Sequence, residues 1–144
     1  MLLSPFIALL ALGVAAWAIV LAWPQKEEPV EPTPESKQKV CAAFDTVTTA
    51  VQLQTHADLG PDPVGQTAVA ANARLSLIGG GEYLLSRVDD KTPPDLAEAV
   101  RMFANNLEDI GVNALAGVTN DDAQQAARLT AGEEGRKKVA ELCQ

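Results

Sequence analysis

Histidine, aromatic residues and basic residues are scarce in this chain, and each shortage excludes a class of site. His56 is the only histidine, so a multi-histidine metal site or a Ser/His/Asp triad would have one imidazole at most. Aromatic residues make up 4% of the chain, too few to predict stacking surfaces for bases or sugars. Acidic residues outnumber basic ones by 19 to 11, so the chain repels phosphate backbones, and we expect no nucleic-acid partner.

Short motifs that carry chemistry are also missing. The Gly-Gly-Gly-Glu run at residues 79–82 has no following Lys-Ser or Lys-Thr and is no phosphate loop. The aspartates near the predicted turns lack the alternation and the closing glutamate of a calcium loop. Cys41 and Cys143 are too far apart to form a CxxC redox pair. We therefore predict a protein that is not an enzyme and that uses no metal or cofactor.

An uncharged apolar run, FIALLALGVAAWAIVLAW, occupies residues 6–23. It is long enough to cross a bilayer as one helix, and Trp23 at its end is typical of a membrane interface. We predict that residues 1–24 form a single transmembrane anchor. A cleaved signal peptide is the alternative, because Ala-Trp-Ala at residues 16–18 resembles a cleavage site. The length of the run and the lack of a preceding Lys or Arg favour the anchor.

Alanines recur every three or four residues along one face of the predicted anchor. In lipid, such a face lets two helices approach closely, and their association depends on that packing. We predict a docking face for another transmembrane helix, with other integral membrane proteins as partners. The alternative is that an alanine-rich composition produces the pattern by chance. The face consists of Ala8, Ala11, Ala15, Ala18 and Ala22.

Residues 25–36 are rich in proline and glutamate and have no apolar periodicity. Proline fixes φ and removes a hydrogen-bond donor, so we predict an extended polyproline-II tether. Residues 37–144 form the predicted folded domain. There, apolar residues recur every three or four positions and clusters of β-branched or aromatic residues are scarce, which predicts an all-α domain.

Turn and cap residues divide this domain into four predicted helices. The first follows Ser36 as its N-cap and ends between residues 56 and 60, where Gly60 and Pro61 break it. The second begins at Pro63 after an Asp62 cap and continues to residue 87 or 88. Gly79, Gly80 and Gly81 lie inside this second helix.

We expect the second helix to continue through these three glycines in a bent or irregular form. Close packing against a neighbour would compensate their low helix propensity. The alternative functional interpretation is a hinge, or a groove in which a ligand approaches the backbone.

The third and fourth helices have clear start signals. The third begins at Pro93 after a Thr92 cap, carries an unbroken apolar stripe and ends at Gly117. The fourth begins at residues 120–122, Asn-Asp-Asp, and continues to Cys143. Its first half carries only a weak stripe of small residues.

Bundle topology predicts that the two cysteines meet. Four helices joined by short turns fold most simply as an antiparallel bundle, in which the chain enters and leaves at the same end. Cys41 lies in the first turns of this bundle and Cys143 in its last turn, so we predict a disulfide; two unrelated buried thiols are the alternative. A disulfide requires an oxidising compartment. We therefore expect the domain outside the cell membrane and the N-terminus in the cytoplasm.

Three stretches carry a resemblance to other proteins: VCAAFDTVTTAVQLQTHADLGPDP, TPPDLAEAVRMFANNLEDIGVNALAGVTNDD and the terminal ELC. Residues 40–143 resemble small, mostly uncharacterised single-pass membrane proteins of mycobacteria and related actinobacteria. The resemblance implies an extracytoplasmic helical domain in the cell envelope and carries no catalytic motif.

Two functions fit these observations. The first is an accessory subunit of a larger cell-envelope membrane complex, a transporter or a respiratory assembly, that docks through the alanine face. The alternative is a tethered extracytoplasmic module that binds a lipid, a peptide or an envelope component. The second predicts an apolar pocket or groove in the domain, whereas a solid core would remove its main support.

Overall fold

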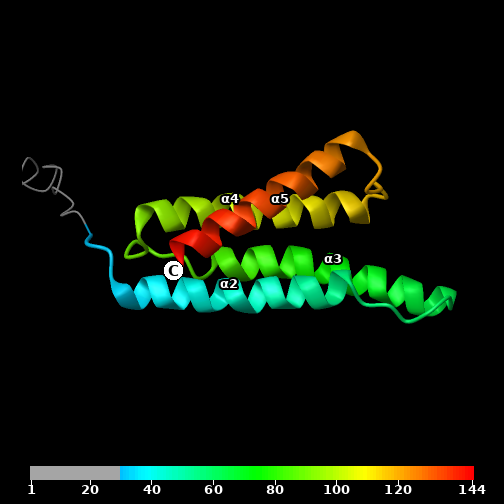
Figure 1. Ribbon diagram of the computed structural model, residues 1–144, viewed down its shortest axis with the longest axis horizontal. Coiled ribbons are helices and arrows are strands. Elements are labelled where there is room, and N and C mark those ends of the chain that lie inside the picture. The colour runs from blue at the N-terminus through cyan, green and yellow to red at the C-terminus, as the bar shows by residue number, and fades with distance from the viewer. Residues whose placement is uncertain (1–29) are drawn as a thin grey trace, which may run out of the picture. The chain divides into compact units, whose positions relative to one another are not determined.

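Four helices make up residues 30–144, the part of the chain that the computed structural model describes (Figure 1). The predicted all-α fold with four helices is confirmed. The predicted anchor, its alanine face and residues 25–29 of the predicted tether lie outside the described residues. The helices are α2 Pro34–Thr55, α3 Pro63–Leu85, α4 Pro94–Leu115 and α5 Ala123–Leu142.

Each helix packs on the next one along the chain, but the first and the last scarcely touch. α3 packs on both α2 and α4, and α5 packs on α4. α5 crosses α4 obliquely and so leaves α2 soon after the end at which the C-terminus lies (Figure 1). The bundle is therefore closed at that end and open along the side between α2 and α5.

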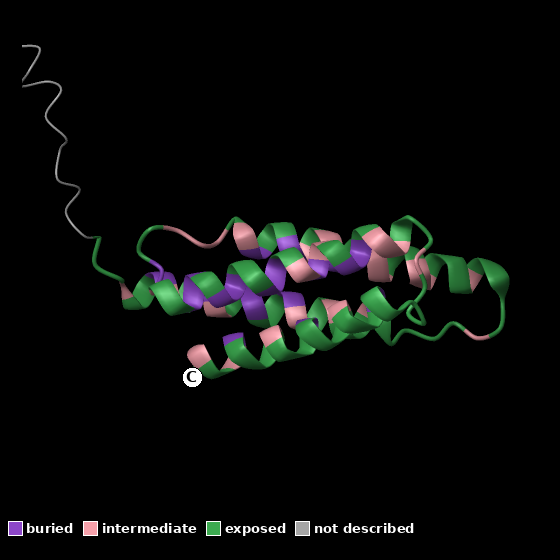
Figure 2. Ribbon diagram, turned by 90° about the horizontal axis from the view of Figure 1, so that it is seen from above, coloured by how far each residue is buried: buried purple, intermediate pink, exposed green. Residues whose placement is uncertain are grey.

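The core lies toward the closed end, and α4 supplies most of it. Phe103 of α4 packs edge-on against Phe44 of α2, with ring centroids 5.7 Å apart. Each fully buried large apolar side chain stabilises the fold by about 1.5–3 kcal/mol. The far ends of α2 and α3 are mostly exposed (Figure 2). The largest buried apolar residues are Val40, Phe44, Val47, Leu77, Leu84, Leu96, Val100, Phe103, Leu107, Ile110 and Val139.

Glycines let α3 approach both of its neighbours. As predicted, α3 continues through Gly79, Gly80 and Gly81. A Cβ on Gly80 would lie 2.8 Å from Val47 Cγ1 of α2, and one on Gly81 would lie 2.7 Å from the Ala104 carbonyl oxygen of α4. Close helix packing thus compensates the poor helix propensity of the run.

α2 begins earlier than the sequence predicts. Its N-cap is Thr33, whose Oγ1 accepts the Ser36 backbone N–H at 3.2 Å, and Pro34 is the first helical residue. The prediction of Ser36 as N-cap was wrong, because Thr33 directly precedes a proline whose fixed φ suits the first helical position. Residues 34–36 of the predicted tether therefore belong to α2.

α4 begins one residue later than predicted. Its N-cap is Pro93, without a side-chain cap, and Pro94 is its first residue. The prediction of a Thr92 cap was wrong, because the Thr92 hydroxyl donates instead to Asp89 Oδ1 at 3.1 Å. α4 ends at Leu115 rather than at the predicted Gly117, whose φ of +89° lies in the left-handed region.

The starts of α3 and α5 are confirmed. Asp62 accepts the Gly65 N–H at 2.7 Å, and Asp122 accepts the N–H groups of Gln124 and Gln125 at 2.9 and 3.0 Å. α3 ends at Leu85, slightly before the predicted residue 87 or 88. Both caps are of the aspartate type that satisfies unpaired donors of the first helical turn.

The closed end is fastened by the predicted disulfide. Cys41 of α2 is bonded to Cys143 at the end of α5, with Cα atoms 5.6 Å apart. The two cysteines are 102 residues apart in sequence, so the bond closes a loop that includes most of the domain. We call this end of the bundle the disulfide end.

A hydrogen-bonded cluster fastens the disulfide end a second time. The Ser36 hydroxyl donates to Asp89 Oδ1 and lies 3.0 Å from Thr92 Oγ1, while Lys39 Nζ donates to Asp89 Oδ2 at 2.8 Å. The hydrogen bonds from Lys39 and Ser36 hold the pKa of the Asp89 carboxyl well below its usual range. The cluster therefore joins the start of α2 to the turn between α3 and α4.

Candidate binding groove

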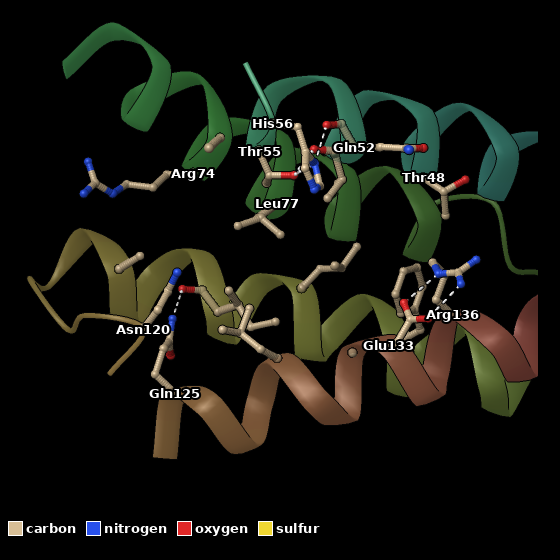
Figure 3. A pocket seen from close by; sticks show the side chains of 18 of the residues that line it. Thr48, Gln52, Thr55, His56, Arg74, Leu77, Asn120, Gln125, Glu133 and Arg136 are labelled. Atoms are coloured by element: carbon tan, nitrogen blue, oxygen red, sulfur yellow. Dashed lines mark hydrogen bonds and ion pairs between the residues drawn. The ribbon is translucent and has the colours of Figure 1, made fainter. Parts of the chain in front are cut away.

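A groove opens between α2 and α5 on the side of the bundle where these helices diverge (Figure 3). Its volume is about 910 Å³, within the range of ~300–1,000 Å³ common for small-molecule sites. All four described helices and the α4–α5 turn contribute lining residues. We call this feature the α2–α5 groove, and the end of the bundle that holds it the groove end.

The floor of the groove is apolar. Leu77 of α3 and Phe103, Leu107 and Ile110 of α4 line it, and Leu129 of α5 lines one wall. Four of these five side chains belong to the buried core, whereas Leu129 is 39% exposed. The groove therefore exposes one edge of the hydrophobic core to whatever enters it.

Small residues leave the groove unfilled. Ala70 and Ala73 of α3, Ala114 of α4 and Gly132 of α5 line it where larger side chains would bridge α2 and α5. Gly132 lies so close to α4 that a Cβ there would be 2.7 Å from Asn106 Oδ1. α5 is therefore drawn toward α4 and away from α2, and nothing large remains to occupy the gap.

The wall of the groove on α2 is partly available for hydrogen bonding to a ligand, because Thr49 and Gln52 have no side-chain hydrogen bond among residues 30–144, whereas Thr48 and Thr55 do. The Thr48 hydroxyl donates to the Phe44 carbonyl oxygen at 2.9 Å, and the Thr55 hydroxyl donates to the Val51 carbonyl oxygen at 2.7 Å. These protons are used within the helix, which is a common arrangement for mid-helix threonine. The wall is therefore less polar than its composition indicates.

Gln125 is the most deeply buried polar residue of the groove, with no exposed surface. Its Nε2 donates to the Ile110 carbonyl oxygen at 3.0 Å, and its Oε1 accepts from Arg128 Nη1 at 3.3 Å. Both ends of the amide are therefore satisfied, as burial requires. Gln125 fixes the first turn of α5 on α4 and so holds that wall of the groove in place.

The charged residues of the groove lie at opposite ends of it. Glu133 and Arg136 of α5 form a bidentate ion pair. Arg136 Nε donates to Glu133 Oε2 and Arg136 Nη2 donates to Glu133 Oε1, each at 2.8 Å. The hydrogen bond from Arg136 lowers the pKa of Glu133 to about 2. Arg74 of α3 lies at the other end in Figure 3 and has no hydrogen bond or ion pair with any side chain of residues 30–144.

His56, the single histidine, lies at the rim of the groove as the C-cap of α2. Its Nδ1 lies 3.0 Å from the Gln52 carbonyl oxygen and 3.2 Å from Thr55 Oγ1. Within residues 30–144, no group of three His, Cys, Asp or Glu side chains is arranged to hold a metal ion.

The residues that the sequence singled out are not those that line the groove. Gly79, Gly80 and Gly81 pack in or near the helix contacts described above and are absent from the lining, and Cys41 and Cys143 lie at the disulfide end. The alanine face falls outside the described residues. Sequence reasoning missed the groove, although the weak stripe of small residues on α5 was a signal that this helix could not fill its contact with α2.

These features define a small disulfide-closed helical domain with one apolar groove. No protein-family model, curated protein or solved structure matches the chain. Among the described helices, none is both long enough and apolar enough to cross a membrane.

Proposed function

We propose that this domain is a non-enzymatic binding module, tethered to the outer face of the cell membrane, that takes an apolar or amphipathic ligand in the α2–α5 groove. The observation that carries the proposal is the groove itself. Buried core side chains such as Leu107 and Ile110 form the floor of a volume of about 910 Å³ that no side chain of the described residues fills. A well-packed bundle of this size has no such opening.

The disulfide supports the extracytoplasmic side of the proposal. Disulfides persist in oxidising compartments and are rare in the cytoplasm. The Cys41–Cys143 bond therefore favours a position outside the membrane, with residues 1–24 as the anchor and the N-terminus in the cytoplasm. The anchor and the orientation remain parts of the proposal.

The accessory-subunit function stays a prediction. It rests on the alanine face from Ala8 to Ala22, which lies outside the described residues. A partner complex could also place one of its own segments in the α2–α5 groove, so the two functions are compatible. We place the binding module first because a described feature of the fold supports it.

The test is to fill the groove without disturbing the core. Ala73→Leu adds a large side chain to the lining, whereas Ala68→Leu adds the same side chain to an exposed position of α3 outside the groove. The full chain and both variants would be purified from membranes under mild conditions, and bound molecules identified by native mass spectrometry. We expect a bound species with the wild type and with Ala68→Leu, and its loss with Ala73→Leu. Equal occupancy of all three would contradict the proposal.

A further inference from the structure

We infer that the ligand of the α2–α5 groove is a single-chain amphiphile with an anionic head group, whose tail lies on the apolar floor and whose head meets Arg74. This inference rests on the proposed function and names its ligand class. It depends on the distribution of charge, hydrogen-bonding groups and apolar surface along the groove.

The groove carries one available charge, and that charge is positive. Glu133 and Arg136 neutralise each other through two hydrogen bonds of 2.8 Å. Arg74 has no such partner among residues 30–144. The chain as a whole has a net charge of −8, so an unpaired cation in this groove runs against the general composition. An anionic group is the complement of such a site.

Arg74 is placed at an end of the groove and not in its middle. Figure 3 shows Arg74, Asn120 and Gln125 toward one end and Glu133 and Arg136 toward the other. Leu77, Leu107 and Ile110 line the stretch between them. A charge at one end followed by apolar surface matches a molecule with a polar head and an apolar tail.

The walls favour a hydrocarbon tail over an extended peptide. A peptide in the groove would bring N–H and C=O groups that need partners. The hydroxyl protons of Thr48 and Thr55 and the amide of Gln125 are already bonded to the protein, which leaves only a few polar side chains, Thr49, Gln52 and Asn120, for such partners. An acyl or alkyl chain needs no such partners and gains about 25 cal/mol for each Å² of apolar surface buried.

The groove is also closed toward the disulfide end, which suits a ligand that enters tail first. There, Cys41 and Cys143 hold α2 against α5 and Val139 is fully buried. At the groove end the two helices diverge, and Leu53, Leu59 and Leu75 near it are all more than 60% exposed, at 64%, 63% and 69%. The tail would point toward the closed end and leave the head at the solvent edge.

The experiment compares four probes on the isotope-labelled full chain, held in an amphipathic polymer and followed by its backbone amide NMR signals. Palmitate has tail and charge, hexadecyl phosphate has tail and a different anionic head, hexadecanol has the tail alone, and acetate has the charge alone. We expect both anionic amphiphiles to shift the Gln125 and Gly132 amides. Hexadecanol should bind about fivefold more weakly than palmitate, because it lacks the charge that interacts with the partly exposed Arg74. Acetate should shift neither amide at the same concentration.

Matched variants assign the head group. Arg74→Gln should weaken palmitate about fivefold and leave hexadecanol unchanged, whereas Arg101→Gln, on an exposed part of α4 outside the lining, should change neither. If Arg74→Gln weakens acid and alcohol equally, the inference is overturned. It is also overturned if only an amphipathic peptide shifts the groove amides, an outcome that leaves the binding-module function standing. If no probe or peptide shifts these amides and Ala73→Leu alters nothing, both proposals fail.

Discussion

The two ends of the helical bundle are made from the same four helices and yet differ in almost every physical property. At the disulfide end, Val40, Val100 and Val139 are fully buried, and a covalent bond and a polar cluster join the helices. At the groove end, α2 and α5 separate and expose apolar surface. The difference reflects where α5 lies, because it packs closely on α4 through Gly132 and leaves α2 beyond the disulfide end.

Charge follows the same division. Residues 46–57, in α2 and just after it, contain no Asp, Glu, Lys or Arg, and neither do residues 63–73 of α3 or the segment 110–120. The disulfide end, by contrast, carries Lys37, Lys39, Asp89, Asp95 and Lys138. Apart from Arg74 and the aspartates of the caps and turns, the groove end is thus poor in charge, and it exposes leucines such as Leu53 and Leu75, as is typical of a binding region.

Breaking the disulfide should have the largest effect on this comparison. We expect the double variant Cys41→Ser, Cys143→Ser to lower the free energy of unfolding by about 4–5 kcal/mol, because the bond restrains a loop of about 100 residues in the unfolded chain. Urea denaturation of the full chain measures this loss. The native protein should also show no free thiol. Two reactive thiols in the native protein would contradict both the bond and the compartment inferred from it.

The second prediction compares two leucines on the same helix. Leu84, in the half of α3 near the disulfide end, is 0% exposed, and Leu75, in the half near the groove end, is 69% exposed. Leu84→Ala should destabilise the fold by about 2–5 kcal/mol through loss of buried surface and formation of a cavity. Leu75→Ala should change stability by no more than about 0.5 kcal/mol. Similar losses for both, measured by urea denaturation, would show that the groove end is as well packed as the disulfide end.

Much of this fold could be predicted from the sequence, because local chemistry specifies most of it. Asp62 was predicted as the cap of one helix and residues 120–122 as the start of another, and both predictions were confirmed, with Asp122 as the second cap. Near Ser36, two hydroxyls competed, and the proline after Thr33 decided between them. The disulfide was predicted from the even number of antiparallel helices, which brings both ends of the domain together. These features need only neighbouring residues or the order of the helices.

The groove could not be predicted in the same way, because it depends on where α5 lies relative to α2. That position results from contacts such as Gly132 against Asn106 and Gln125 against the Ile110 carbonyl oxygen. Neither contact has a signature in sequence spacing. Arg74 likewise belongs to no sequence motif, and only the fold shows that it lines the groove without a partner among residues 30–144.

A third prediction sharpens the role of the glycine run by comparing two of its members. A Cβ on Gly81 would lie 2.7 Å from the Ala104 carbonyl oxygen, whereas a Cβ on Gly79 would have no atom within 4 Å. Gly81→Ala should destabilise the fold by about 1–3 kcal/mol, because backbone must move to admit the methyl group. Gly79→Ala should stabilise it by about 0.5–1 kcal/mol through higher helix propensity. If thermal denaturation finds both variants stabilised, the run does not hold α3 against α4.

The last and smallest expected effect is on the pH dependence of stability. It concerns the hydrogen-bonded cluster around Asp89 at the disulfide end. The pKa of Asp89 is lowered in the folded protein by the hydrogen bonds from Lys39 and Ser36. Its contribution to stability is therefore fully present above the unfolded pKa of about 4. It is lost as the pH falls through the lower folded pKa, when the carboxylate takes up a proton and the Lys39 ion pair is broken. Because the carboxylate is exposed, the loss should be modest and weaker in high salt.

Asp89→Asn separates this effect from the titration of other acids. The variant keeps an oxygen that can accept from Ser36 and Thr92 but carries no charge for Lys39. Its stability should fall less steeply than that of the wild type between about pH 4 and pH 2. Glu133→Gln is the matched control at the groove, because the pKa of Glu133 is also lowered, to about 2, by its Arg136 partner. The measurement is the urea midpoint of unfolding as a function of pH. If the midpoint becomes less dependent on acid pH only in Glu133→Gln, the acid-sensitive ion pair that stabilises the fold is the one on α5 and not the Asp89 cluster.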